Sequence, residues 1–239
     1  MSAQDEKPVK SRQLPLDFPE AGLTLDTLCV TSANRTAIGV LKRWPDWRNP
    51  ALAVVGAPKS GLTTAAAAWA QHAGGELITA RAFDRLSHKK VDALSSSPVA
   101  IDLGEAVSNE DNLLSLINLS GRAGGSVLIT GHTSPARWRV KLPDLASRLK
   151  AMTLVELKAP DDEMAAIRLR KAMRRRYLKL PEDVEAYILT RIERNYAAIE
   201  TFVQSLHEMA DGREITVPLA RDVMDAAGGT RSLFENGHQ

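Results

Sequence analysis

Short apolar runs separated by helical stretches make up residues 23–158 of the chain. Each run is bounded by glycine, proline, serine or a charged residue, which is typical of buried strands. The stretches between the runs place apolar residues at three- and four-residue spacing, as amphipathic helices do. Strands are predicted at 52–55, 76–79, 99–102, 126–130 and 152–156. Because strands and helices alternate, the pattern predicts an α/β fold with a parallel sheet flanked by helices.

The strand signals stop after Pro160. Asp161 begins a helix that runs to about residue 176, and further helix starts fall at Pro181, Asn195 and Thr216. We interpret this part as a small all-α domain behind the α/β core. The predicted division is an N-terminal arm at 1–22, a core at 23–158 and a helical domain at 159–239.

Composition indicates an ordinary globular protein of 239 residues, with 44% hydrophobic and 25% charged residues. A formal net charge of +2 gives no overall signal for a polyanion partner. The single cysteine, Cys29, excludes an intramolecular disulfide and suits a reducing compartment. No secretory signal and no run approaching the ~18 apolar residues of a membrane span is found. We therefore expect no membrane association and a cytoplasmic location.

The glycine-punctuated turn at 56–63 follows the first strand and precedes a run of helix formers. It fits the phosphate-binding pattern G-x-x-x-x-G-K-[ST] at every fixed position except the lysine, where Leu62 stands. Glycines let backbone N–H groups surround phosphate oxygens, and the next helix adds its positive dipole end. Without the lysine, the affinity for ADP or ATP is expected to be weak. The candidate nucleotide-binding residues in this turn are Gly56, Lys59, Ser60, Gly61 and Thr63. The alternative is a strand-turn-helix whose glycines serve only the turn.

The strand at 99–102 ends in Asp102, and a strand-terminal aspartate orients Mg²⁺ at the phosphates in many P-loop proteins. Leu103 follows, where many such ATPases carry a second acid. Thr130 and His132 come at the end of another strand, which an open parallel sheet would place beside Asp102. They are candidate γ-phosphate sensors. Asp102 fits a turn cap equally well, and His132 fits a solvated loop better; apart from Mg²⁺ at Asp102, no metal site is expected.

Two further segments carry candidate binding chemistry. In the arm, Gln13 is followed by Leu14, Leu16 and Phe18, whose spacing of two puts three apolar side chains on one side of an extended peptide. Such a peptide either docks in a partner's groove or folds back on its own domain. In the first helix of the all-α domain, six cations fall within residues 168–176. A solvated face is the commoner explanation, and contact with a phosphate backbone or an acidic partner is the alternative.

The order of these parts, together with the Ser147-Arg148-Leu149 box, resembles the AAA+ family of the bacterial replication initiator DnaA, especially its shortened Hda-type regulators. The resemblance runs from about Arg12 to Ala226 and lacks DnaA's duplex-reading domain. It implies that the helical domain is a lid and that the arm peptide binds the DNA polymerase sliding clamp. It also implies that Arg148 is an arginine finger that enters a neighbour's nucleotide site.

The chain departs from the family pattern at Leu62, at Leu103 and near Ala197, where a lid arginine would reach the nucleotide. Three blank positions favour a protein that hydrolyses nothing itself. The resemblance implies an adaptor that binds the clamp and promotes ATP hydrolysis on DnaA, which represses replication initiation. The alternatives are an interaction module that only blocks initiator assembly, and a weak independent ATPase using Lys59. Nucleotide occupancy, homo-oligomer formation and contact of the basic helix with DNA stay open.

Overall fold

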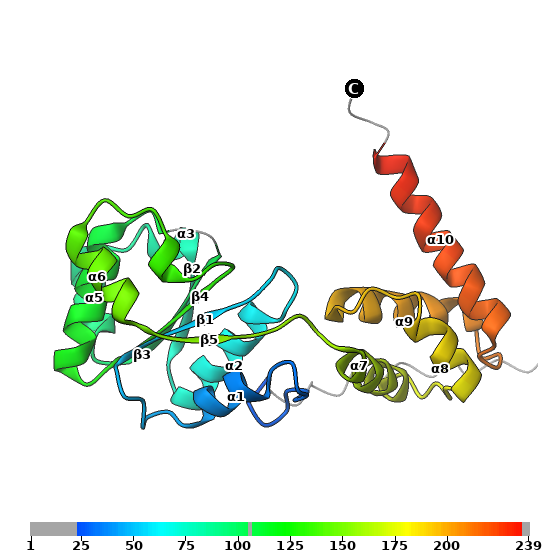
Figure 1. Ribbon diagram of the computed structural model, residues 1–239. Helices are drawn as coiled ribbons and strands as arrows, with labels where there is room; N and C mark the ends of the chain where they lie inside the picture. The colour runs from blue at the N-terminus through cyan, green and yellow to red at the C-terminus, as the bar shows by residue number, and fades with distance from the viewer. Residues whose placement is uncertain (1–22, 105–106, 236–239) are drawn as a thin grey trace, which may run out of the picture.

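Five parallel strands form one twisted sheet in the computed structural model, which describes residues 23–104 and 107–235, with side chains up to residue 226 (Figure 1). The strand order is β2-β3-β4-β1-β5, with every neighbouring pair parallel. The strands are β1 (Ala51–Val55), β2 (Glu76–Thr79), β3 (Pro98–Gly104), β4 (Ser126–Gly131) and β5 (Thr153–Glu156). The predicted α/β fold with a parallel sheet is confirmed.

Helices cover both faces of the sheet because side chains alternate along each strand. On one face, Ile101 and Ile129 pack with Leu116 and Leu145 from the covering helices. On the other, Leu128 belongs to a cluster built around Trp69. The first face carries α3 (Ala80–Phe83), α4 (His88–Leu94), α5 (Glu110–Ala123), the 3-10 turn η1 (Pro135–Arg137) and α6 (Pro143–Ala151), and the second carries α1 (Arg35–Lys42) and α2 (Leu62–Ala73).

The sequence pattern gave no prediction for α3 and α4. Both helices are too short to display a 3.6-residue period, since they span four and seven residues. Their starts are nevertheless capped: the Thr79 hydroxyl accepts from the Ala82 N–H, and the Ser87 hydroxyl accepts from the Lys90 N–H. Capping therefore marks two helices that periodicity alone misses.

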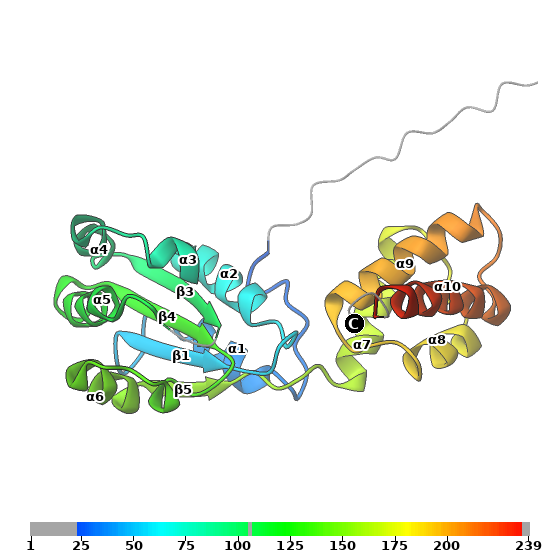
Figure 2. The ribbon, with the colours of Figure 1, turned by 90° about the horizontal axis from the view of Figure 1, so that it is seen from above.

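Four helices form the carboxyl-terminal part, which lies beyond the carboxyl ends of the strands (Figure 2). They are α7 (Asp162–Arg175), α8 (Glu182–Leu189), α9 (Tyr196–Ala210) and α10 (Val217–Glu235). Leu169, Ile188, Phe202 and Val203 belong to a core of their own. The all-α character is confirmed, and the helix whose start was predicted at Thr216 is α10, which runs to Glu235. None of the helices in the described residues is long and apolar enough to cross a membrane.

The segment before α1 fixes the first helix of this second part. Ala33 O accepts from the Lys158 N–H at 3.2 Å, and Ser32 Oγ donates to Asp161 Oδ2 at 3.1 Å. Asp161 is also the N-cap of α7, where Oδ1 accepts from the Met164 N–H at 2.8 Å. Partial burial would raise the pKa of Asp161, but these hydrogen bonds outweigh it and hold the pKa below its ordinary value. One carboxylate thus joins the N-terminal segment to the helical domain.

Replacing Asp161 with alanine should lower the free energy of unfolding by about 1 kcal/mol, because α7 loses its cap. Chemical denaturation at neutral pH measures the change. Because the pKa of Asp161 is lowered from 3.8, its charge-dependent stabilisation is complete above that value and is lost as pH falls through the folded-state pKa. The difference between the two proteins should therefore narrow in that acidic range.

The matched control is Glu163→Ala, in the same first turn of α7. Glu163 is exposed, and no side-chain hydrogen bond to it is found in the described residues. We expect this change to stay within about 0.5 kcal/mol of the parent. Equal effects of the two substitutions would contradict the capping role of Asp161.

Candidate functional site

The P-loop segment, residues 56–63, connects β1 to α2 and has the backbone that its glycines allow. Gly61 is left-handed, with φ of 99°, at the N-cap of α2. At Gly56, an added Cβ would lie 2.4 Å from Leu157 O, which only glycine avoids. Lys59 is also left-handed, with φ of 66°, a conformation uncommon outside glycine. At Gly56 the segment therefore packs closely against the backbone of Leu157, the residue that directly follows β5.

Leu62, which stands at the lysine position of the motif, is the first residue of α2 and is 6% exposed. It belongs to the same core cluster as Leu52, Ala66 and Leu157. Leu103, at the position of the second acid, is 5% exposed and packs in the core of the opposite face. These two side chains contribute apolar burial at a sheet edge where a P-loop ATPase would place charge.

Asp102 joins the P-loop segment to the neighbouring strand. Thr63 Oγ1 donates to its Oδ2 at 2.6 Å, and Thr130 Oγ1 donates to its Oδ1 at 2.6 Å. Because Asp102 and Thr130 are partners in the β3–β4 register, the predicted neighbourhood of the two strand ends is confirmed. Carboxylate and hydroxyl oxygens are ligands that Mg²⁺ accepts, so Asp102 and Thr63 fit a phosphate-bound Mg²⁺ once the threonine turns its proton elsewhere. In the described residues, no group of three or more His, Cys, Asp or Glu is arranged to hold a metal ion.

Other polar groups of this edge also have partners within the protein. Lys59 Nζ lies 3.1 Å from Glu193 Oε2, just before α9, and Asn195 Nδ2 donates to the same oxygen at 2.7 Å. His132 Nδ1 lies 3.2 Å from Gly56 O. Ser60 Oγ is buried and has no hydrogen-bond partner in the part of the chain that the structure describes. Lys59 therefore points toward the helical domain and pairs with a carboxylate there.

Arg148 lies apart from all these residues. It is exposed on α6, and within residues 23–104 and 107–226 its side chain makes no hydrogen bond or ion pair. Because α6 ends at Ala151 and β5 begins at Thr153, Arg148 lies close to the amino end of β5. The P-loop segment follows the carboxyl end of β1, at the opposite edge of the same parallel sheet (Figure 2). Arg148 is therefore at the far edge from its own P-loop segment.

The helical domain matches a known family directly. The family model described as "Hda, lid domain" matches residues 161–224. The whole fold is similar to domain III of the Thermotoga maritima replication initiation protein DnaA, with a TM-score of 0.67 and 17% identity over 85% of this chain and 96% of that one.

Two further structures have the same fold. AMPPCP-bound DnaA from Aquifex aeolicus gives a TM-score of 0.63 and 18% identity, covering 82% of this chain and 74% of that one. RuvB from Thermotoga maritima gives a TM-score of 0.65 and 14% identity, covering 85% of this chain and 72% of that one. The helical domain is thus similar to the Hda lid family, and the whole chain has the fold of DnaA domain III.

The basic helix α7, which begins the domain that matches the Hda lid family, is largely neutralised by carboxylates of its own domain. Arg170 pairs with Glu185 at 2.7 Å, and Arg175 and Arg176 both pair with Glu200. Hydrogen bonding to Glu185 raises the pKa of Arg170, so its charge is fixed. Arg168 lies over the Tyr196 ring, 5.4 Å from its centre. Among the six cations, only Lys171 and Arg174 lack a side-chain partner in the described residues. Contact of this helix with DNA stays a prediction, and fewer of the six cations are unpaired and available for it.

The remaining residues singled out in the sequence lie in three separate places. Ala197 is exposed in the first turn of α9, beside the loop that carries Glu193. The arm peptide lies outside the described residues, so its contacts stay predictions; its residues are Gln13, Leu14, Leu16 and Phe18. Cys29 is half-buried, and burial raises the pKa of its thiol, which favours an unreactive side chain.

The sequence analysis did not single out two acidic residues that the tertiary structure places near the carboxyl ends of the strands. Glu193 precedes the predicted helix start at Asn195 and pairs with Lys59. Glu110 begins α5 and accepts hydrogen bonds from the start of α6. In sequence, both read as ordinary acids near helix starts, and their partners lie 134 and about 31 residues away. No local pattern reports contacts of that separation.

Replacing Asp102 with alanine should lower the free energy of unfolding by about 1–3 kcal/mol, because the buried Thr130 hydroxyl loses its acceptor. Chemical denaturation of the isolated chain without nucleotide measures this change. Asp92→Ala is the control, since Asp92 is exposed on α4 and no side-chain hydrogen bond to it is found in the described chain; we expect a change within about 0.5 kcal/mol. Unchanged or increased stability of Asp102→Ala would mean that the carboxylate serves only an absent ligand.

Proposed function

We propose that this chain is a regulator of DNA replication initiation that acts on DnaA carrying ATP. Its helical domain matches the Hda lid family and its fold is that of DnaA domain III, which supports a role in the DnaA system. In this proposal the chain promotes hydrolysis on DnaA by inserting Arg148 into DnaA's nucleotide site. A guanidinium placed there neutralises charge on the transferring phosphoryl group, which is worth about 10³-fold or more in rate.

The observation that carries the proposal is the position of Arg148. It is exposed and free of side-chain partners within the described residues, and it lies at the sheet edge opposite its own P-loop segment. A side chain there cannot serve the nucleotide edge of its own sheet. An arginine at the opposite edge is, however, suited to meet the nucleotide edge of a neighbouring AAA+ module packed against it.

The carboxyl edge of this chain's own sheet, where the P-loop segment lies, also supports a role in which hydrolysis takes place on DnaA. In this proposal the nucleotide site is degenerate. Leu62 and Leu103 pack in the core where a lysine and a second acid would stand, and Ala197 offers no cation in place of the lid arginine. Lys59 is paired with Glu193, and Asp102 with two threonines. ADP or ATP with Mg²⁺ could bind there only by displacing these internal contacts, so the chain turns over no ATP alone.

The proposed partners are DnaA and the DNA polymerase sliding clamp, the latter bound through Leu14, Leu16 and Phe18. One solved neighbour is DnaA bound to AMPPCP and single-stranded DNA, with a TM-score of 0.66 and 18% identity over 92% of this chain. DNA is therefore a further candidate partner of this chain, which would reach it through the free cations of α7.

A second candidate function is an interaction module that blocks initiator assembly without stimulating hydrolysis. The internally satisfied nucleotide edge favours it equally, because such a module needs no nucleotide of its own. Phosphate release from DnaA in the presence of the clamp on DNA separates the two functions. A third candidate, a weak ATPase using Lys59, predicts saturable ATP binding by the isolated chain that Lys59→Ala abolishes.

Replacing Arg148 with alanine should reduce the stimulated rate of ATP hydrolysis on DnaA by about 10³-fold, toward the unstimulated rate. The assay measures phosphate release from DnaA with clamp loaded on DNA. Lys150→Ala is the matched control, because Lys150 is an exposed cation two residues further along α6; we expect its rate to stay within about twofold. Full stimulation by the Arg148→Ala protein would reject the trans arginine.

Replacing Leu16 and Phe18 together with alanine should abolish retention on immobilised sliding clamp, because the apolar side of the peptide is lost. A pull-down with purified proteins measures the retention. Val9→Ala, in the same arm but outside the peptide, should bind as the parent does. Unaltered retention of the double variant would favour packing of the peptide on its own domain.

A further inference from the structure

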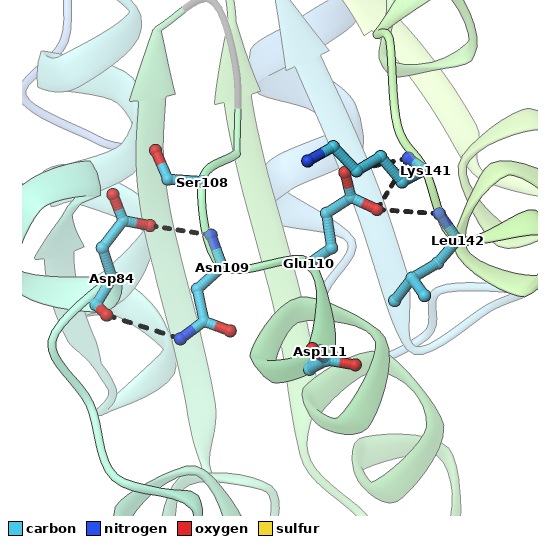
Figure 3. Close-up of a pocket in the computed structure, with 7 residues that line it drawn as sticks. All are labelled: Asp84, Ser108, Asn109, Glu110, Asp111, Lys141 and Leu142. Carbon is cyan, nitrogen blue, oxygen red and sulfur yellow. Dashed lines mark hydrogen bonds between the residues drawn. The ribbon is translucent and has the colours of Figure 1, made fainter.

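The start of α6 is held by a carboxylate from α5 (Figure 3). Glu110 accepts from the Lys141 N–H at 2.9 Å on Oε1 and at 2.8 Å on Oε2, and from the Leu142 N–H at 2.8 Å on Oε2. These N–H groups lower the pKa of the Glu110 carboxyl below its usual range, so it is ionised at neutral pH. One side chain thus joins the first turn of α5 to the residues on which α6 begins. We call this contact the Glu110 tether.

The tether supplies what the sequence of α6 lacks. The N-cap of α6 is Leu142, whose side chain has no polar atom, so it offers the backbone no cap within the described chain. Many helices satisfy the N–H of the N-cap residue with a glutamate or glutamine at the third helical position. In α6 that position is Leu145, which is buried in the core. Glu110 therefore provides from another helix the acceptor that a capping box provides locally.

Packing alone leaves the direction of α6 weakly defined. Within α6, the fully buried side chains are Leu145 and Leu149, which lie one turn apart on a single stripe. Leu142 and Met152, at the two ends of the helix, pack only partly against the same core. The apolar contacts therefore hold α6 against the core mainly along one line. Arg148 follows Leu142 by six residues, or about 9 Å along the helix axis, so a tilt of about 10° at the start moves its backbone by about 1.5 Å. A misplacement of that size is enough to cost about 10²-fold in rate at a catalytic site.

A second pair of hydrogen bonds joins the start of α5 to the end of α3. The Asn109 N–H donates to Asp84 Oδ1 at 3.2 Å, and Asn109 Nδ2 donates to Asp84 O at 3.4 Å. Asn109 is in turn the N-cap of α5, where Oδ1 accepts from the Asn112 N–H. A cavity of about 410 Å³ is lined by these residues, with Asp84 on one side, Lys141 and Leu142 on the other, and Asn109 and Glu110 between them (Figure 3). These polar contacts connect the three helices across a space that apolar packing does not fill.

We propose that Glu110 is the positioning residue for Arg148: its tether to Lys141 and Leu142 sets the direction of α6 and thereby aims the arginine at the partner's nucleotide. This inference rests on the proposed function, because it assumes that Arg148 acts in trans. Glu110 itself touches no substrate. Removing the Glu110 side chain should therefore leave binding to DnaA unchanged and lower the rate of ATP hydrolysis within the complex.

The experiment measures ATP hydrolysis on DnaA over a range of concentrations of the full chain, with clamp on DNA. For Glu110→Ala we expect the maximal stimulated rate to fall by about tenfold to 10²-fold, while the half-saturating concentration stays within about twofold. Glu110→Gln keeps one acceptor oxygen for the two N–H groups, so it should recover part of the rate. The matched control is Asp111→Asn, which removes the same charge beside the same cavity, and no hydrogen bond to the Asp111 side chain is found in the described residues. It should leave both parameters unchanged.

Hydrogen exchange of the isolated chain provides a readout that needs no partner. In Glu110→Ala, amides of the first turns of α6 should exchange about tenfold faster or more, while those of α9 in the helical domain should keep the parent rates. Faster exchange throughout the chain would instead show general destabilisation and overturn the positioning role. So would unchanged exchange in α6.

Arg148→Ala in the assay of ATP hydrolysis on DnaA separates the two proposals. If Arg148→Ala loses stimulation but Glu110→Ala keeps the maximal rate, the positioning role is overturned and the proposed function stands. If Arg148→Ala keeps full stimulation, the proposed function fails, and the inference fails with it. Loss of maximal rate in both variants, with partial recovery in Glu110→Gln, supports both.

Discussion

The parallel sheet is the constraint on which the rest of this structure depends. Parallel strands require crossover connections, so every strand ends at one edge and every crossover helix runs back to the other. The P-loop segment, Asp102 and Thr130 therefore meet at the carboxyl edge, and the helical domain lies beyond it (Figure 2). The end of α6, with Arg148, is brought to the amino edge. A single topological rule thus separates the arginine from the nucleotide edge of its own chain.

At the carboxyl edge, Asp102 and Lys59 are paired inside the protein, whereas Ser60 Oγ has no hydrogen-bond partner in the described residues. The Thr130–Asp102 and Lys59–Glu193 contacts differ in how much they contribute to stability. Thr130 is fully buried, so its bond to Asp102 avoids the cost of an unpaired hydroxyl in the core. The Lys59–Glu193 pair is exposed at both ends, and solvent screening leaves it worth little for stability. Its significance is geometric, because it connects the P-loop segment directly to the helical domain.

Carboxylates decide how much of the basic charge is free. On α7, Glu185 and Glu200 neutralise arginines whose clustering in sequence left contact with a phosphate backbone or an acidic partner open. On α6, no comparable partner is found for Arg148 in the described chain. Charge clusters in sequence therefore overstate what a partner meets, since acids from neighbouring helices are far away in sequence. The isolated arginine of α6 is the more available group, and the Glu110 tether holds the helix that carries it.

The sequence by itself determined the alternation of strands and helices, the P-loop turn and the all-α carboxyl-terminal part. These features follow from local spacing of apolar residues and from glycines that a turn requires, as at Gly61. It could not determine α3 and α4, which are too short for a period, or the pairings of Glu110 and Glu193. Those contacts join residues far apart in the chain, and only the packing of helices on the sheet brings them within hydrogen-bond distance. The tertiary structure also decided that Leu62 is a core residue, because burial depends on what surrounds a position and not on the motif it occupies.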